Sequence, residues 1–286
     1  MLSRAGTSLV ELMVALALAA LVLGAATSSL LHQQRGARWA GALGGAESQM
    51  RPLVQMLPSE LAPLDAGVGD VVSGQASDST LQLRAVVASS VTCDSASVAL
   101  TLLPDATSGV AIGGVARAPV AGDSLWFYSS DSLGWQPRRV LAVAHPSTSC
   151  RMPASLAGGS YRLTLDAAAG VPGGTPVRVT RHERYAVYRA SDGWWYLGVR
   201  AWSATTASFT APQPIAGPFL RSLPGGAITG FRYFDSIGAV VAPNGTNEQS
   251  IARVRVSSIA RVPSLAGSDT LRRDSADVAL ARRGAY

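Results

Sequence analysis

The first 35 residues of the chain are MLSRAGTSLVELMVALALAALVLGAATSSLLHQQR. The 20 residues from Leu12 to Leu31 contain no charge, and Glu11 stands directly before them. About 20 apolar residues are enough for a helix to cross a bilayer. An ionised carboxylate at such a place costs a few kcal/mol unless it meets a partner or reaches the interface. The stretch therefore predicts a membrane-spanning helix, and it predicts that the carboxylate of Glu11 has a functional role.

The residues before the apolar run form a recognisable motif. The leader MLSRAG, residues 1–6, has Arg4 as its only charge and ends in Gly6, and Glu11 follows shortly after. This pattern resembles the prepilin signature of type IV pili and of type II secretion pseudopili. The resemblance implies that a prepilin peptidase cuts between Gly6 and Thr7 and methylates the new amino terminus at Thr7. The family most often has Phe at the first mature position, where this chain has Thr7.

The same resemblance implies a role for Glu11. In the family's assembly model the acid pairs with the amino terminus of a neighbouring subunit, here the amine created at Thr7. In a low-dielectric environment an opposite charge strongly favours the ionised carboxylate. Polar groups buried among helices are best known for setting helix register. We therefore expect Glu11 to be an assembly contact that is costly alone and satisfied between subunits.

Two other interpretations of this stretch stay open. An ordinary secretory signal peptide also has a basic start, an apolar core and small residues, which residues 24–26 would supply here. Against it, the acid stands at the head of the apolar run, and the run is long for a signal core. A plain membrane anchor is the third interpretation.

Residues 32–58 continue the helical pattern. Apolar residues recur at steps of three and four, which predicts one buried face of an amphipathic helix: Trp39, Leu43, Ala46, Met50, Leu53 and Leu57. We expect this stripe to pack on a soluble domain. We also expect Pro52 to kink or interrupt the helix, and Pro58 and Pro63 to end the pattern.

The chain after residue 58 changes to strand patterns. Alternating runs such as 81–86 and 161–165 are separated by clusters of Gly, Pro, Asp and Ser, which is typical of strands and turns. Asp192-Gly193 between two aromatic runs predicts a β-hairpin over residues 184–200. The expected fold class is α+β and pilin-like, with a long N-terminal membrane-spanning helix packed on a β-rich globular head with antiparallel sheets.

The expected organisation has four parts. Residues 1–6 are the prepilin leader peptide, and residues 7–31 are the hydrophobic transmembrane and assembly helix. Residues 32–58 are its amphipathic continuation, and residues 59–286 are the β-rich periplasmic or extracellular head. Within the head, residues 184–281 loosely resemble the larger minor subunits of type IV pili and of type II secretion pseudopili.

The two cysteines, Cys93 and Cys150, both fall in the expected head. Disulfides persist in the periplasm and outside the cell, and the two residues show no metal or redox spacing. We predict a Cys93–Cys150 disulfide that closes a loop of roughly 58 residues and contributes about 4 kcal/mol in the chain-entropy model. The alternative is two free, buried thiols.

The charge pattern argues against a nucleic-acid partner. The formal net charge is +6, and all 24 basic residues are arginines. They are spread along the chain, with no basic helix and no recognisable nucleic-acid module. We therefore do not expect DNA among the partners.

The sequence shows no pattern of catalysis. Of the three histidines, His182 lacks the second histidine that a zinc helix needs four residues further on. No G-x-S-x-G motif occurs, and we expect the carboxylates Asp65 and Asp70 to be solvated in a loop. The expectation is a protein that is not an enzyme, with no cofactor and no metal.

The resemblance implies a structural minor subunit of a type IV pilus or a type II secretion pseudopilus, acting in initiation or at the tip. The implied partners are the prepilin peptidase, other pilin or pseudopilin subunits and the inner membrane. The precursor would cross the inner membrane once, with its head in the periplasm or at the cell surface. The alternative function is a secreted or membrane-anchored β-sandwich binding module with an ordinary signal peptide.

Overall fold

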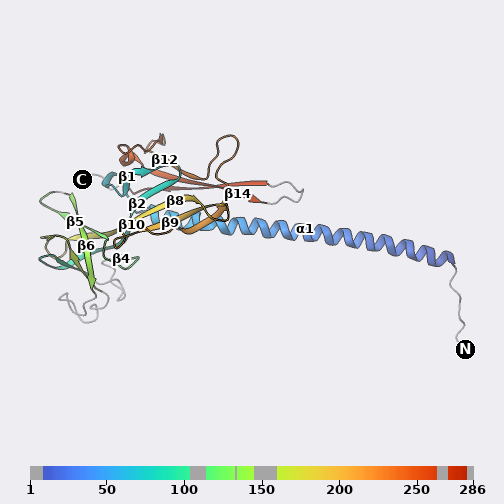
Figure 1. Cartoon of the computed structure of the whole chain (residues 1–286), viewed down its shortest axis with the longest axis horizontal. Helices are drawn as coiled ribbons and strands as arrows, with labels where there is room; N and C mark the ends of the chain where they lie inside the picture. The colour runs from blue at the N-terminus through green and yellow to red at the C-terminus, as the bar shows by residue number, and fades with distance from the viewer. Residues whose placement is uncertain (1–8, 104–113, 133, 145–159, 263–269, 282–286) are drawn as a thin grey trace, which may run out of the picture.

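The computed structural model describes residues 9–103, 114–132, 134–144, 160–262 and 270–281. It consists of one long helix and a β-rich head gathered around the second half of that helix (Figure 1). The helix α1 spans Leu9–Leu61, 53 residues, and is therefore about 80 Å long at 1.5 Å per residue. This arrangement confirms the α+β, pilin-like fold class with antiparallel sheets.

Helix α1 runs through both of its prolines. Pro52 and Pro58 lie inside the helix, which ends at Leu61, between Pro58 and Pro63. The expectation of an interruption at Pro52 is therefore wrong, whereas a kink there stays a prediction. A proline inside a helix costs about 3 kcal/mol, whereas burying one large apolar side chain contributes about 1.5–3 kcal/mol. Several such side chains follow one another on the packed face: Met50, Leu53, Leu57 and Leu61, each 2% exposed or less. Their burial outweighs the cost of the prolines, which explains why the helix continues.

The predicted apolar stripe is confirmed over most of its length. Leu43 packs against the core of the head, and the stripe is fully buried from Met50 onward. Trp39, at the start of the predicted stripe, is 37% exposed and does not belong to the core. The head therefore covers α1 only from about residue 43.

The head contains fifteen strands and two short 3-10 helices within the described residues. The strands are β1 (Val71–Ala76), β2 (Thr80–Ala96), β3 (Ala99–Leu102), β4 (Gly114–Val115), β5 (Ser124–Ser129), β6 (Gly134–Ala144), β7 (Tyr161–Leu165), β8 (Pro176–Arg189), β9 (Trp195–Ser203), β10 (Ser208–Phe209), β11 (Gln213–Phe219), β12 (Gly230–Phe234), β13 (Val240–Val241), β14 (Arg253–Val262) and β15 (Thr270–Ala279). The 3-10 helices are η1 (Ala66–Val68) and η3 (Glu248–Ser250).

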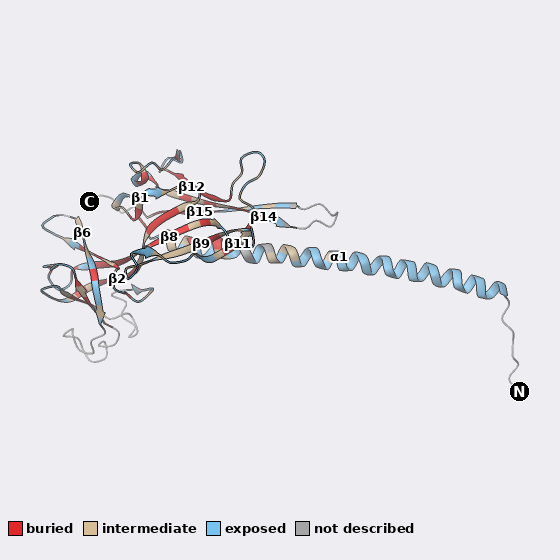
Figure 2. Cartoon of the chain, viewed as in Figure 1, coloured by how far each residue is buried: buried red, intermediate tan, exposed pale blue. Residues whose placement is uncertain are grey.

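The lobe nearest α1 is built from two antiparallel sheets. Strands β1, β2, β8, β9 and β11 belong to the larger sheet, and β13-β12-β14-β15 form a four-stranded sheet. Helix α1 contacts β11, β14 and β15, so its packed half lies against both sheets. Figure 2 shows the buried residues of this lobe between the strands and the end of α1. One hydrophobic core joins the helix to both sheets.

The lobe farthest from the start of α1 is a closed ring of strands. Pairing runs from β2 through β3, β7, β6, β5 and β8 and returns to β2. All these pairs are antiparallel, and they enclose a second core that includes Leu100, Phe127 and Leu163. Strands β2 and β8 pass through both lobes, pairing from Thr80 with Ala186 to Val91 with Pro176. These two long strands hold the lobes together.

The predicted hairpin is confirmed. β8 and β9 pair antiparallel, with Arg189 opposite Trp195 at the turn. Gly193 has φ +85°, a conformation that other residues rarely adopt. The Asp192 carboxylate accepts a hydrogen bond from the Trp194 N–H at 2.9 Å, which stabilises the turn locally.

Candidate assembly site on the long helix

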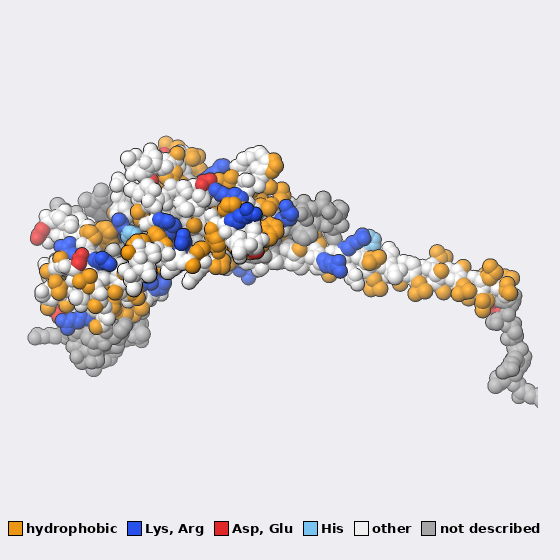
Figure 3. Space-filling model, in the orientation of Figure 1, with side chains coloured by type: hydrophobic (Ala, Val, Ile, Leu, Met, Phe, Trp, Pro, Cys, Tyr) orange, Lys and Arg blue, Asp and Glu red, His pale blue; other side chains and the backbone are white. Residues whose placement is uncertain are grey.

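No described part of the head packs on the first half of α1. Every residue from 9 to 35 is exposed, including Leu9 at 76% and Leu21 at 70%. Figure 3 shows hydrophobic side chains on the projecting part of the helix. This segment is long and apolar enough to cross a membrane. An apolar surface of this size marks a membrane or partner contact, so we take it as the candidate functional site.

Glu11 lies in the first turn of the described helix and is exposed. A carboxylate there is favoured by the helix dipole, by about 0.3–1 kcal/mol when solvated. It forms no ion pair within the described residues. The next arginine along α1 is Arg35, 24 residues later, which places it about 36 Å away. A cationic partner for Glu11 must therefore come from the residues that precede the described helix or from another molecule.

Of the other predicted site residues, the structure describes only Cys93. Gly6 and Thr7 lie outside the described residues, so cleavage and methylation there stay predictions. Cys93 is half-buried in β2, in the head, far from the start of α1 (Figure 1). Cys150 also lies outside the described residues, and the Cys93–Cys150 disulfide stays a prediction.

Two groups of ion pairs hold the second half of α1 on the head. Glu47 accepts a hydrogen bond from Arg272 of β15 at 2.8 Å. Glu60 lies 3.4 Å from Arg117, which also pairs with Glu183 of β8. Burial raises the pKa of Glu183 above its ordinary value, and the attraction of Arg117 offsets only part of this effect. Arg117 therefore bridges the helix and the strand that runs through both lobes.

The chain just after α1 is anchored by a buried ion pair. Asp70 Oδ2 accepts hydrogen bonds from the Asp65 N–H at 3.0 Å and from Arg178 Nη1 at 2.9 Å. The side chains of Asp70 and Arg178 are 0% and 3% exposed. The Arg178 guanidinium also lies 5.4 Å from the ring centre of Trp126 and 5.3 Å from that of Trp135. This cluster joins the chain just after α1 to the distal lobe.

The expectation that Asp65 and Asp70 are solvated is wrong. Asp65 is 5% exposed, and its Oδ1 accepts a hydrogen bond from the Gly67 N–H at 2.8 Å as it caps η1. The Asp-x-Gly spacing is a local signal for such a turn. The ion pair between Asp70 and Arg178 joins residues 108 positions apart, and no local signal could have revealed it.

We also searched the described residues for a metal centre and compared the chain with known proteins. Among the residues that the structure describes, no group of His, Cys, Asp and Glu could hold a metal ion. No family model, no curated protein and no solved structure matches the chain. The functional interpretation therefore depends on the helix, its acid and its junction with the head.

Proposed function

We propose that this chain is a structural minor subunit of a type IV pilus or a type II secretion pseudopilus. The observation that carries the proposal is the division of one continuous helix, Leu9–Leu61, into an uncovered apolar half and a half packed in the head. The uncovered half serves first as a membrane anchor and then as the core of a filament. The packed half transmits the position of the helix to the head.

The continuity of α1 supports this function over an ordinary signal peptide. Cleavage by a signal peptidase near residue 26 would divide the helix in the middle of its exposed half. The remaining helix would keep exposed apolar residues such as Leu30 and Leu31, 56% and 53% exposed, without the segment that anchors them. Glu11 would be discarded with the signal.

Glu11 supports assembly over a plain anchor. A lone spanning helix leaves this carboxylate without a described partner, at a cost of a few kcal/mol if it enters the hydrocarbon region. After cleavage at Gly6, the amine at Thr7 of a neighbouring subunit supplies the missing charge. Thr7 and Glu11 are four positions apart, so this contact sets an axial offset between neighbouring subunits.

The remaining parts of the proposal follow from this assembly. The precursor crosses the inner membrane once, with its head in the periplasm and later at the cell surface. Its partners are the prepilin peptidase, other pilin or pseudopilin subunits and the membrane itself. The role is structural rather than catalytic, in initiation or at the tip of the filament.

The first test is mass spectrometry of the mature amino terminus of the native protein. Cleavage after Gly6 gives a chain that starts at an N-methylated Thr7. A chain that keeps Met1, or that starts near Thr27, would contradict the proposal, the latter in favour of the secreted binding module.

The second test is the substitution Glu11→Gln in the native host. Removing the charge leaves membrane insertion and cleavage intact, because neither needs the intersubunit pair, and it lowers incorporation into filaments by about tenfold or more. Glu47→Gln is the matched control, since it makes the same change on the same helix outside the apolar half and breaks only the exposed ion pair with Arg272, which contributes about 0–1 kcal/mol. Equal incorporation of the Glu11→Gln variant and the wild type, or an equal loss in the control, would refute the role of Glu11.

A further inference from the structure

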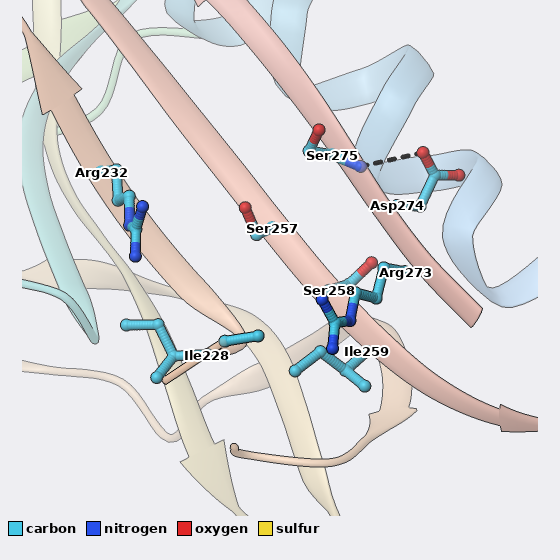
Figure 4. Close-up of a pocket in the computed structure, with 9 residues that line it drawn as sticks. Ile228, Arg232, Ser257, Ser258, Ile259, Arg273, Asp274 and Ser275 are labelled. Carbon is cyan, nitrogen blue, oxygen red and sulfur yellow. Dashed lines mark hydrogen bonds between the residues drawn. The ribbon is translucent and has the colours of Figure 1, made fainter. Parts of the chain in front are cut away.

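A pocket of about 300 Å3 opens on the four-stranded sheet beside the loop that precedes β12 (Figure 4). It is lined by residues of β12, β14, β15 and this loop, and its main side chains are Ile228, Arg232, Ser257, Ile259, Arg273 and Ser275. Figure 4 shows Arg232 and Arg273 on opposite sides, with Ser257 between them. No part of the proposed assembly function uses this pocket.

The pocket lies on the face of the sheet that points away from α1. Arg272 of β15 pairs with Glu47 of α1, and the hydroxyl of Tyr233 in β12 lies 3.0 Å from the carbonyl oxygen of Thr80 in β2, to which it can donate a hydrogen bond. Successive side chains of a strand point to opposite faces. Arg273 and Arg232, the neighbours of these two residues, therefore point to the outer face. A pocket there stays open to solvent when α1 is covered by a membrane or by other subunits.

The two arginines of the pocket are free, unlike others on the same sheet. Arg255 forms an ion pair with Asp277 at 2.7 Å, and Arg253 lies over the ring of Phe234 at 4.5 Å. Arg232 and Arg273 form no hydrogen bond, ion pair or ring contact with any residue that the structure describes. Two unpaired guanidinium groups beside one hollow create a positive field that attracts anions.

Carboxylates do not neutralise this field on the outer face of the pocket. Asp274 is the one acid among the described lining residues. Because Asp274 is adjacent to Arg273 in β15, its side chain points to the opposite face of the sheet. Its Oδ1 is also engaged by the Ser275 N–H at 2.8 Å (Figure 4). The outer face therefore carries the two arginine charges with no described acid in the pocket to oppose them.

The spacing of the two arginines suits a ligand the size of a sugar. Arg232 pairs with Arg255, and Arg273 pairs with Ile259, four residues further along β14. The two Cα atoms are therefore offset by about 13 Å along the strands and by about 10 Å across them. Long side chains that reach inward from these positions leave room for one or two small rings between their guanidinium groups.

The lining also indicates the chemical class of the ligand. Guanidinium groups bind carboxylate and phosphate in a two-pronged geometry. The hydroxyls of Ser257 and Ser275 can both donate and accept hydrogen bonds, which suits a hydroxylated ligand. The half-buried side chain of Ile228 offers an apolar surface to the C–H face of a ring. No aromatic residue occurs among the described lining residues, so a nucleobase would lack the stacking surface that single strands need.

We propose that this pocket binds an acidic saccharide, a sugar ring that carries a carboxylate or a phosphate, through Arg232 and Arg273. The sugar lies between the two guanidinium groups: its anionic group pairs with one of them, a ring oxygen accepts a hydrogen bond from the other, and the ring hydroxyls contact Ser257 and Ser275. The inference is independent of filament assembly, because it concerns the outer face of the head.

The test is calorimetric titration of the full chain in detergent micelles. The probes are a trimer of galacturonic acid and glucose 6-phosphate, which distinguish a carboxylate from a phosphate. Maltotriose and inorganic phosphate are the controls for the ring alone and for the charge alone. We expect at least one acidic sugar to bind, binding to weaken with added salt, and each of Arg232→Gln and Arg273→Gln to lower the affinity about tenfold.

The matched control is Arg162→Gln. Arg162 is an exposed arginine of β7 in the distal lobe, without a partner among the described residues, so its loss removes the same charge far from the pocket. Both pocket arginines are exposed and unpaired, so the variants are expected to keep the wild-type unfolding temperature. The proposal is overturned by absence of binding of both acidic sugars, by inorganic phosphate binding as tightly as they do, by an equal loss in Arg162→Gln, or by single-stranded DNA that binds more tightly.

Discussion

The two halves of α1 form one unbroken helix and differ in what surrounds them. From residue 9 to residue 35 all side chains are exposed, whereas Met50, Leu53, Leu57 and Leu61 are each 2% exposed or less. The first half is apolar on all sides, which is typical of a helix that is buried in a membrane or among other helices. The second half has one apolar stripe, which matches one-sided packing on a head. The head therefore stabilises the second half, whereas the first half needs an environment outside the described chain.

The largest expected effect comes from removing the buried ion pair of Asp70 with Arg178, which lies just after the packed half of α1. Asp70→Asn leaves the Arg178 guanidinium buried without its charge partner. We expect the free energy of unfolding of the head to fall by about 3–5 kcal/mol. Denaturation of the full chain in detergent, followed by tryptophan fluorescence, measures this change, since Trp126 and Trp135 lie against Arg178.

Asp277→Asn is the control for this substitution. The pair of Asp277 with Arg255 is 39% and 36% exposed, and such pairs contribute about 0–1 kcal/mol. An equal effect of the two substitutions would mean that the Asp70 pair is not a buried anchor.

The second way compares one leucine from each half of α1. Leu61→Ala removes a side chain that is 0% exposed, and we expect the free energy of unfolding of the head to fall by about 2–5 kcal/mol. Leu21→Ala makes the same change at a side chain that is 70% exposed, and we expect no measurable change in head stability. The same fluorescence-detected denaturation measures both. Destabilisation of the head by Leu21→Ala would mean that the first half also packs on it.

The smallest expected effect concerns Glu183, which Arg117 links to α1. Burial raises the pKa of Glu183 above the ordinary value of 4.5, so the folded state holds its proton more tightly than the unfolded chain. Its contribution to stability is therefore fully present below pH 4.5 and is lost as the pH rises through the raised pKa. We expect the stability of the wild type relative to Glu183→Gln to fall over this range. Denaturation at several pH values checks this, and a relative gain with rising pH would mean that the attraction of Arg117 dominates.

The local patterns of the chain were enough to predict its general plan. The uncharged run after Glu11 predicted the exposed apolar helix, and the stripe ending at Leu57 predicted the packed half. The Asp192-Gly193 turn predicted the hairpin of β8 and β9. Each of these signals lies within a short window of sequence, because helix periodicity, strand alternation and turn conformation are properties of neighbouring residues.

The continuation of α1 past Pro52 shows where local signals end. The cost of a proline inside a helix is a local property of the sequence. The burial of apolar side chains that outweighs this cost depends on strands more than a hundred residues away. The same limit applies to Arg272 and Arg273, adjacent arginines that meet different surroundings. Alternation predicts that they point to opposite faces, and only the packing of β15 on α1 decides which of them meets Glu47.

Periodicity and composition were enough to predict the helix of membrane length, the acid at its start and the β-rich class of the remainder. The tertiary structure alone decided the closed ring of six strands, the buried pair of Asp70 with Arg178 and the pocket between Arg232 and Arg273. Each of these joins residues that are distant in the chain, and their meeting depends on strand order and register. Those are set by the packing of the whole head, which no short stretch of sequence encodes.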